Sequence, residues 1–203
     1  VLLSFEGEAE RVDPDDIKAE RQAVIRGKVK DINGQPLSGV QVTVIDHPEY
    51  GETFSREDGE VYMVVNGGAS LGLKFRKPGY LPAERKLTPN WRDYTWLEED
   101  VALVQLDDQR TAVELDGGAT EVQVAQGSPV ADSSGPRQST LFFQPGTEAT
   151  AEFADGHTVP LPNANVRASE ITVGPNGPAA MPAELPPTSA YTYAVAFTSD
   201  EAM

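Results

Sequence analysis

Apolar residues recur at every second position in short runs along this chain. Val40–Val44 alternates valine with polar residues, and Leu71–Phe75 has the same spacing. A period of two places alternate side chains on opposite faces of a strand. Long apolar stretches with a period near 3.6 are missing, so the pattern predicts many short strands in place of a helical bundle. The predicted fold class is all-β.

Turn signals separate these runs at regular intervals. Asn33-Gly34 and Asp58-Gly59 are dipeptides that tolerate positive φ in tight hairpins, and Asn66–Gly68 and Lys77–Tyr80 supply two further turns. With the apolar run from Leu97 to Leu106, the spacing predicts about seven strands, the size of one small β-sandwich.

A second set of strand candidates follows the first. Between it and the chain end lies Gly174–Pro187, whose prolines cannot donate to a strand ladder, so a loop of polyproline character is expected there. We expect this second β module to continue past Met203. The predicted strands are 121–125, 139–143, 148–153, 165–173 and 191–198.

The first 22 residues are charged and poor in core-forming side chains. Asp13 can cap a helix, Pro14 suits its first position, and Asp15 and Asp16 would face the positive end of its dipole. We therefore divide the chain into an N-terminal tether with one short helix (1–22), a first sandwich (23–107) and a second β module (108–203).

Composition excludes several classes of partner and site. The 203 residues hold 18 Gly and 16 Pro, in keeping with many turns, and carry a net charge of −16. An acidic surface repels phosphate backbones and anionic lipids, so no nucleic acid is predicted as a partner. Membrane insertion is not predicted, because no apolar run approaches the roughly 20 residues that span a bilayer. Cysteine is absent, which excludes disulfides and thiolate sites.

The candidates for catalysis are few, and the prediction is that the chain is not an enzyme. His47 and His157 are the only histidines, one in each module, so acid–base work by the pair would require the modules to meet there. Both lie at expected turns, although Asp46, His47 and Glu49 could together ligate a metal. Neither a Gly-x-Ser-x-Gly motif nor a glycine-rich phosphate loop occurs.

No cofactor is predicted, and calcium is the one metal ion considered. Oxygen-rich loops bind calcium outside cells. The acidic candidates lack the ligand spacing and the glycine of an EF-hand loop, so solvated charge at a helix start and a strand end is the favoured explanation for them. These candidates are Asp13, Asp15 and Asp16, and Glu98, Glu99 and Asp100.

Three aromatic residues form a separate candidate for ligand binding. Trp91, Tyr94 and Trp96 could form a strip on which sugar rings stack. Their alternation favours core packing or a module interface over sugar binding. Neither the sugar-binding nor the packing interpretation is excluded by the sequence.

Three segments of the first module carry a family resemblance. Residues 31–42, 53–62 and 75–80 hold Asp-x-x-Gly-x-Pro-Leu-x-Gly-Val-x-Val, a Thr…Asp-Gly…Tyr turn and Phe-Arg-Lys-Pro-Gly-Tyr, in that order. Together they resemble the carboxypeptidase regulatory-like domain over residues 23–106. The resemblance implies a seven-stranded, transthyretin-like (prealbumin-like) β-sandwich. The urate-pathway hydrolases on that fold carry a C-terminal Tyr-Arg-Gly-Ser signature, which this sequence lacks.

The second half resembles a region that follows such a sandwich in bacterial YD-repeat (Rhs, teneurin-like) proteins. The matching segments are 127–130, 137–147, 172–182 and 185–193. The resemblance implies a fibronectin-type plug that seals a hollow β-shell of YD repeats, and that shell would follow Met203.

The two resemblances together give a functional hypothesis. We expect a non-catalytic segment that caps or plugs the YD-repeat shell of a large secreted or cell-surface bacterial protein, teneurin-like or toxin-related. Its main partner would be that shell, within the same polypeptide. The alternative is an extracellular adhesion module that binds a cell-surface protein or glycan.

Overall fold

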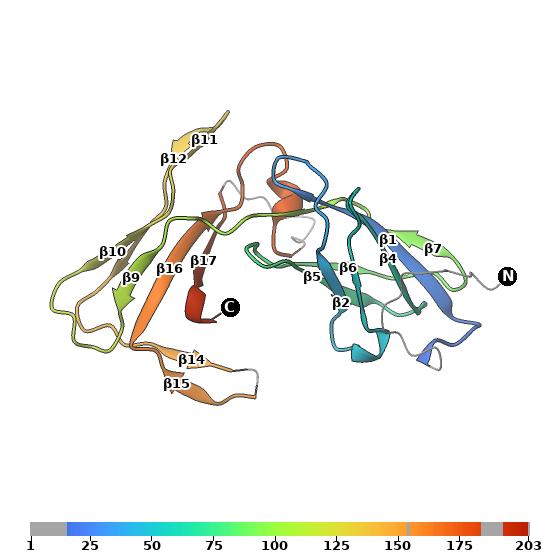
Figure 1. Cartoon of the computed structure of the whole chain (residues 1–203), viewed down its shortest axis with the longest axis horizontal. Helices are drawn as coiled ribbons and strands as arrows, with labels where there is room; N and C mark the ends of the chain where they lie inside the picture. Colours follow the sequence, from blue (N-terminus) through green and yellow to red (C-terminus); the bar gives the residue numbers. More distant parts are fainter. Residues whose placement is uncertain (1–15, 154, 184–192, 203) are drawn as a thin grey trace. The chain divides into compact units, whose positions relative to one another are not determined.

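The computed structural model describes residues 16–153, 155–183 and 193–202, which are all-β apart from short 3-10 turns (Figure 1). This confirms the predicted fold class. The described residues divide into two compact units, and each is treated by itself. The first unit holds residues 16–105 and 174–183, and the second holds the remainder. Within these ranges no helix has the length and apolar character needed to cross a membrane.

One sheet of the first unit is built around its longest strand, β1 (Gln22–Asp31). β1 pairs antiparallel with β4 (Glu60–Asn66) on one edge. On its other edge it pairs in parallel with β7 (Tyr94–Trp96) and then with β8 (Val101–Leu103). The described part of this unit therefore has eight strands where about seven were expected, and two of them, β7 and β8, share one edge of β1.

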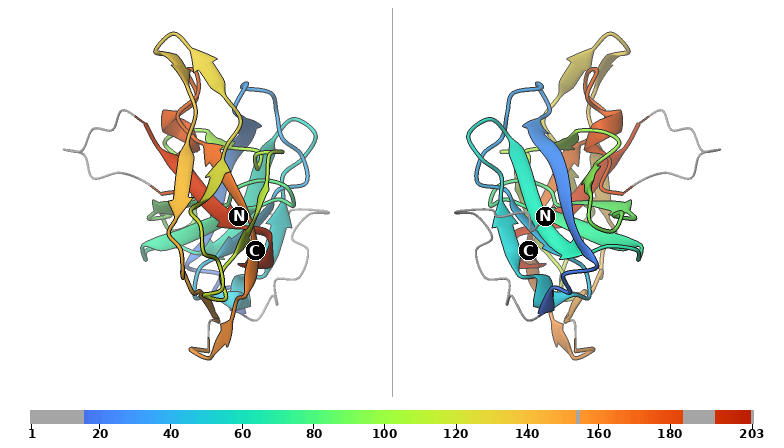
Figure 2. Two further views of the ribbon diagram at one scale, coloured as in Figure 1. Left: turned by 90° about the vertical axis from the view of Figure 1, so that its left-hand side faces the viewer. Right: turned by 90° about the vertical axis from the view of Figure 1, so that its right-hand side faces the viewer.

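The other sheet of the first unit has the order β3-β2-β5-β6, with antiparallel neighbours throughout. Its strands are β3 (Glu52–Phe54), β2 (Gln41–Val44), β5 (Leu71–Arg76) and β6 (Ala83–Leu87). Figure 2 shows β1 and β4 side by side in the view that faces this unit.

The core of the first unit lies between these two sheets. The alternating positions predicted to share a face are buried, from Val40–Val44 on β2 to Leu71–Phe75 on β5. The hairpin turn at Gly59 also behaves as expected. Its φ is +79°, and a Cβ there would lie 2.3 Å from the carbonyl oxygen of Val29. Only glycine fits this turn without a shift of the backbone.

Residues 174–183 fold back onto the first unit and do not form the polyproline loop that was expected. Pro178–Ala180 is a 3-10 turn (η3) that packs against β8. Asn176 Nδ2 donates to the carbonyl of Ile32 at 3.0 Å, and the N–H of Glu84 on β6 donates to the carbonyl of Pro182 at 2.6 Å. The segment thus covers β8 and satisfies part of the β6 edge.

Arg85 on β6 holds this returning segment. Its guanidinium donates to the carbonyls of Ala179 at 2.6 Å and Met181 at 3.0 Å, and also to that of Glu84. The side chain is largely buried, so these carbonyls take the place of the water that a buried guanidinium would lose.

The second unit contains a three-stranded antiparallel sheet and a two-stranded ribbon. The sheet has the order β17-β16-β9, formed by Val195–Ser199, Asn163–Glu170 and Thr111–Glu114. The ribbon pairs β10 (Gln123–Gln126) with β13 (Thr140–Phe143). The small core contains Val113, Leu115, Ala125, Ala164 and Val166.

Two further hairpins complete the second unit (Figure 2, left). One pairs β11 (Val130–Asp132) with β12 (Gly135–Arg137), and the other pairs β14 (Thr150–Glu152) with β15 (Thr158–Pro160). All five strands expected in this half are present with shifted ends. The sequence pattern missed β9, β11, β12 and β15.

The helix predicted from Asp13 lies outside the described residues. From residue 16 the chain already belongs to the first unit, because Ile17 packs against its core. The N–H of Lys18 donates to Asn66 Oδ1 at 2.9 Å, which ties the entry of β1 to the end of β4.

Candidate functional site

The outer face of the β4-β1-β7 sheet carries a cluster of aromatic residues around one arginine. Arg26 on β1 is the direct cross-strand partner of Tyr62 on β4 and of Trp96 on β7. Directly opposed residues point to the same face of a sheet, and so does Tyr94, two positions before Trp96. We call Arg26, Tyr62, Tyr94 and Trp96 the aromatic–arginine face.

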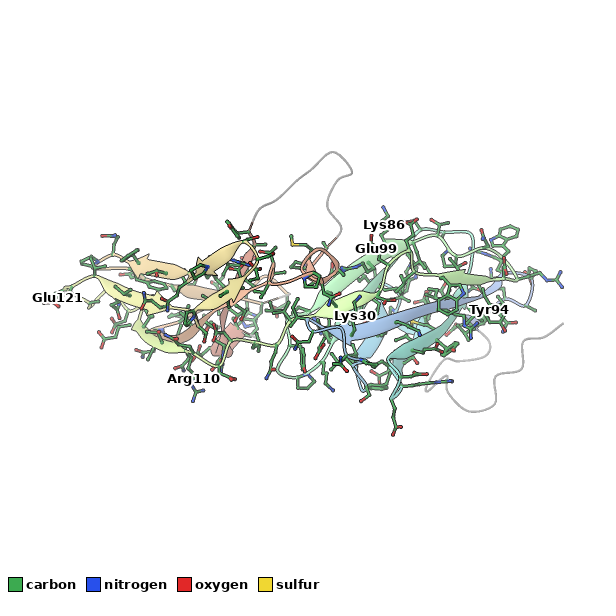
Figure 3. All side chains as sticks on the ribbon, turned by 90° about the horizontal axis from the view of Figure 1, so that it is seen from above. Lys30, Lys86, Tyr94, Glu99, Arg110 and Glu121 are labelled. Atoms are coloured by element: carbon green, nitrogen blue, oxygen red, sulfur yellow. The ribbon has the colours of Figure 1, made fainter. Side chains whose placement is uncertain are left out.

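The Arg26 guanidinium lies over all three rings of this face. Its central carbon is 4.6 Å from the ring centroid of Tyr62, 4.9 Å from that of Trp96 and 5.2 Å from that of Tyr94. Arg26 also donates to the Tyr62 hydroxyl at 2.9 Å. Trp96 nevertheless remains 50% exposed. Tyr94, which is labelled in Figure 3, is also partly exposed. Cation–π contacts therefore fix the guanidinium on an accessible surface.

The structure brings together two of the three predicted aromatic candidates. Trp91 is 58% exposed and lies beside Gly68 and Arg21, whose guanidinium is 5.9 Å from its ring centroid. Sequence reasoning missed Arg26 and Tyr62. Their outward positions on alternating strands were the available signal, but the pairing of β1 with both β4 and β7 was not predictable from spacing.

Two arginines of this region have no acidic partner among the described side chains. The Arg26 guanidinium contacts the three rings and the Tyr62 hydroxyl, and its Nε is buried without a hydrogen-bond partner. Arg21 donates to the carbonyl of Gly67. Nearby, Lys28 lies 3.7 Å from Glu60. Glu60 also accepts a hydrogen bond from the Tyr62 hydroxyl, and the Asp93 carboxylate accepts from the N–H of Tyr94. Three basic side chains therefore lie near two acidic ones, in a chain that has twice as many acidic as basic residues.

The second unit exposes an apolar surface on its β10–β13 ribbon. Val124 and Phe142 are cross-strand partners, 44% and 65% exposed, and Val122 beside them is 47% exposed. On the opposite side of the ribbon, Ala125 and Leu141 pack into the core. The ribbon therefore has two apolar faces, and we call Val122, Val124 and Phe142 the apolar ribbon face.

Further apolar side chains of the second unit are also exposed. Phe197 on the edge strand β17 is the cross-strand partner of the buried Ala168, and so it shares the core face of the sheet, yet it is exposed. The hairpin of β14 and β15 exposes Phe153 and Val159. Single exposed apolar residues are common, but several on one small unit give it a large exposed apolar area.

Each histidine is engaged locally, in a different unit. His47 Nδ1 is 2.8 Å from Glu49 Oε1, and this hydrogen bond lowers the pKa of Glu49. His157 hydrogen-bonds Asp155, whose pKa is lowered for the same reason, and stacks on Phe153 at 4.3 Å. Each histidine ring thus pairs with a carboxylate two residues away in its own surface turn.

An open cavity of about 480 Å³ in the first unit includes His47 in its lining. Asp46, Ser70 and Glu84 also line it, and they come from separate loops and from β6. Over the described part of the chain, no hydrogen bond joins Ser70 to His47, so the cavity contains no serine activated by a base.

The acidic candidates for calcium do not form a site in the described ranges. Asp13 and Asp15 lie outside those ranges, and Asp16 is placed at the start of the first unit, where its carbonyl accepts from Asn66. Asp100 pairs with Lys30 at 3.5 Å, and the preceding residues Glu98 and Glu99 are exposed. Figure 3 labels Lys30 and Glu99. Nowhere among the described side chains do three or more His, Cys, Asp or Glu gather to hold a metal ion.

The first unit matches a known protein family along most of its length. Residues 17–103 match the family described as "Teneurin TTR-like domain". Residues 17–103 form a teneurin TTR-like domain. The eight-stranded sandwich is therefore the fold of this domain, and the carboxypeptidase regulatory-like resemblance pointed to the corresponding region of the chain.

Whole teneurins are similar to this chain over a longer stretch. Teneurin-1 of Homo sapiens is 30% identical over 156 residues, 76% of this chain and 5% of that protein. Teneurin-1 of Gallus gallus is 40% identical over 96 residues, 46% of this chain and 4% of that protein. The human alignment is longer than the TTR-like match, so similarity extends outside the TTR-like domain.

The chain spans about one-twentieth of the length of these teneurins. Among solved structures, the "Structure of the Streptococcal ancillary pilin" has a TM-score of 0.32 at 7% identity, covering 70% of this chain and 59% of that one. A likeness at this level carries no argument about fold or function.

Proposed function

We propose that this chain is a non-catalytic structural segment whose second unit caps or plugs a β-shell of YD repeats. The parent would be a large secreted or cell-surface bacterial protein, Rhs-like, teneurin-like or toxin-related, and the shell would belong to the same polypeptide. The observation that carries the proposal is the apolar ribbon face. Burial of that face against a shell would stabilise both bodies, because apolar area removed from water is favourable.

The similarity to teneurins supports the same proposal. It extends outside the TTR-like domain, and the chain corresponds to a small part of proteins that are many times longer. A segment embedded in so long a protein has other parts of it available to cover its exposed apolar side chains. The reading frame that follows this chain should encode YD repeats, and its sequence gives a first check.

A labelling experiment tests the burial of the apolar ribbon face. The chain has no cysteine, so Phe142→Cys introduces a unique thiol in the 203-residue chain. We expect maleimide to label it rapidly there and at least about tenfold more slowly in the longer polypeptide that includes the repeats, with site occupancy read by mass spectrometry. Glu57→Cys, in an exposed turn of the first unit, is the control that should react equally in both. Equal labelling of the Phe142→Cys variant in the two polypeptides would contradict the plug role.

A further inference from the structure

We propose that the aromatic–arginine face of the first unit binds an acidic oligosaccharide whose acidic groups are uronate carboxylates. The proposal is independent of the plug role, because it uses a different unit and a different surface. It rests on the ring geometry, on the charge of the face and on the cost of keeping Arg26 where it is.

The ring geometry suits a sugar chain. Tyr62, Arg26 and Trp96 lie in one row across three neighbouring strands, so the row spans about 10 Å at the usual strand spacing. The guanidiniums of Arg26 and Arg56 already lie over the Tyr62 ring, so Trp96 is the ring of this row that can stack on a sugar. The C–H groups on the face of a sugar ring carry partial positive charge, and the face of an aromatic ring is negative. Trp96 keeps half of its surface available for such stacking, and Trp91 adds a second exposed indole on the same domain.

The charge of the face selects an anionic ligand. Arg26 is held by rings and by the Tyr62 hydroxyl, and Arg21 by a ring and a backbone carbonyl, with no direct ion pair to a carboxylate in the described residues. The nearest carboxylate to Arg26 in this network is that of Glu60, which accepts from the Tyr62 hydroxyl. Guanidinium groups bind carboxylates through paired hydrogen bonds, and uronate supplies a carboxylate on a ring. The rest of the chain is strongly acidic, so attraction to an anion has to come from a local cluster such as this one.

A purely structural role accounts poorly for Arg26. Its buried Nε has no hydrogen-bond partner, and an unsatisfied buried donor lowers stability. A smaller polar residue at this outward position of β1 would avoid that cost. The three rings and the Tyr62 hydroxyl instead hold the guanidinium in one place before any ligand arrives, which reduces the entropy lost on binding.

Titration of the 203-residue chain with a hyaluronan octasaccharide tests the proposal. Both tryptophans lie in the first unit, so their fluorescence reports on this domain alone, and calorimetry gives the affinity. A neutral chitin oligosaccharide of equal length and an oligoglutamate of equal charge are the comparison ligands. We expect binding of hyaluronan that weakens as NaCl rises, with much weaker binding of the other two.

Variants locate the site. We expect Trp96→Ala and Arg26→Gln each to weaken hyaluronan binding about tenfold. The matched controls on the opposite sheet, Phe54→Ala and Arg76→Gln, replace an exposed aromatic and an exposed arginine and should leave binding unchanged. Circular dichroism checks the fold, and if Trp96→Ala unfolds, Trp96→Tyr keeps a ring and should retain part of the affinity.

Three results would each overturn the proposal. Absence of hyaluronan binding would remove the ligand. Equal binding of the chitin oligosaccharide or of the oligoglutamate would show that uronate is not recognised, and the second case would point to an acidic protein segment. Full affinity in folded Trp96→Ala and Arg26→Gln would place the site elsewhere.

Discussion

The two units of this chain differ in how they are held together. Among the described residues, sixteen buried hydrophobic residues form the core cluster between the sheets of the first unit, whereas the core cluster of the second contains five. At the same time the second unit exposes large apolar side chains such as Phe142 and Phe197. The first unit thus has the larger enclosed core, although its aromatic–arginine face is exposed, whereas the second unit combines a small core with exposed apolar side chains on its ribbon and on β17.

Arginine–carboxylate contacts replace part of the missing core in the second unit. Arg137 forms a paired interaction with Asp132, with both distances 3.0 Å, and also lies 3.3 Å from Glu170. Arg167 holds Asp200 at 2.7 Å, which ties the last 3-10 turn, η4 (Asp200–Ala202), to β16. A small core is therefore supplemented by charge pairs, which respond to pH and salt as apolar packing does not.

The largest expected difference in stability between the two units comes from replacing a phenylalanine by alanine in each of them. Phe75 in the first unit is fully buried, so Phe75→Ala should lower the free energy of unfolding by about 3–5 kcal/mol. Phe142 is 65% exposed, so Phe142→Ala should change it by no more than about 0.5 kcal/mol. Urea unfolding, followed by tryptophan fluorescence for the first unit and by NMR for the second, measures both. A large loss for Phe142→Ala would mean that the apolar ribbon face is already covered in this chain.

A second test asks whether the returning segment is part of the first unit's stability. Arg85→Met removes the donors to the carbonyls of Ala179 and Met181 while keeping a long side chain, and should cost about 2 kcal/mol. Lys86→Met, at the exposed neighbouring position, should stay within about 0.5 kcal/mol. Tryptophan fluorescence during urea unfolding is again the measurement. Equal midpoints for the two variants would mean that residues 174–183 contribute little to this unit.

The first unit was largely predictable because its signals are local. Alternating valines and glycine turns such as Asp58-Gly59 specify strands and hairpins without reference to distant residues, and the structure confirms them. Eight strands occur where about seven were expected, and the apolar run from Leu97 to Leu106 forms a strand only over Val101–Leu103. The parallel pairing of β7 and β8 with β1 leaves no mark in local spacing.

The returning segment could not be located from the prolines alone. The prolines correctly indicate that residues 174–183 do not form a strand. They do not indicate that the segment packs against β8. One signal was present: Val101–Val104 is apolar at four consecutive positions, as in a strand buried on both sides. Nothing in that pattern identifies which segment covers the outer side, because such contacts join residues far apart in the chain.

The aromatic–arginine face shows the same limit at the level of a site. Trp91, Tyr94 and Trp96 were identifiable as candidates because large aromatics are conspicuous in sequence. Arg26 and Tyr62 were not, since they join the cluster only through the pairing of β1 with two other strands. Cross-strand neighbours depend on register, which the hydrophobic pattern restricts but does not fully determine.

The smallest expected effect concerns acid, which should loosen the second unit before the first. The hydroxyl of Ser199, followed by the N–H of Asn165, lowers the pKa of Glu201 from 4.5 to about 2. The hydrogen bond from Arg167 likewise lowers the pKa of Asp200. A carboxylate with a lowered folded-state pKa stabilises the fold above its unfolded-state pKa, and that contribution is lost as pH falls toward the folded value.

NMR spectra at pH 6, 4 and 3 can follow the two units separately. Between about pH 4.5 and 2 we expect backbone signals of β16 and β17 to broaden or shift, while those of β2 and β5 in the first unit persist. Glu201→Gln removes one titrating group and should reduce the pH dependence of the β16 and β17 signals. Glu57→Gln in the first unit should leave that pH dependence unchanged. If the signals of both units are lost at the same pH, the carboxylate contacts contribute no more to the stability of the second unit than to that of the first. The two units would then differ only in the size of their cores.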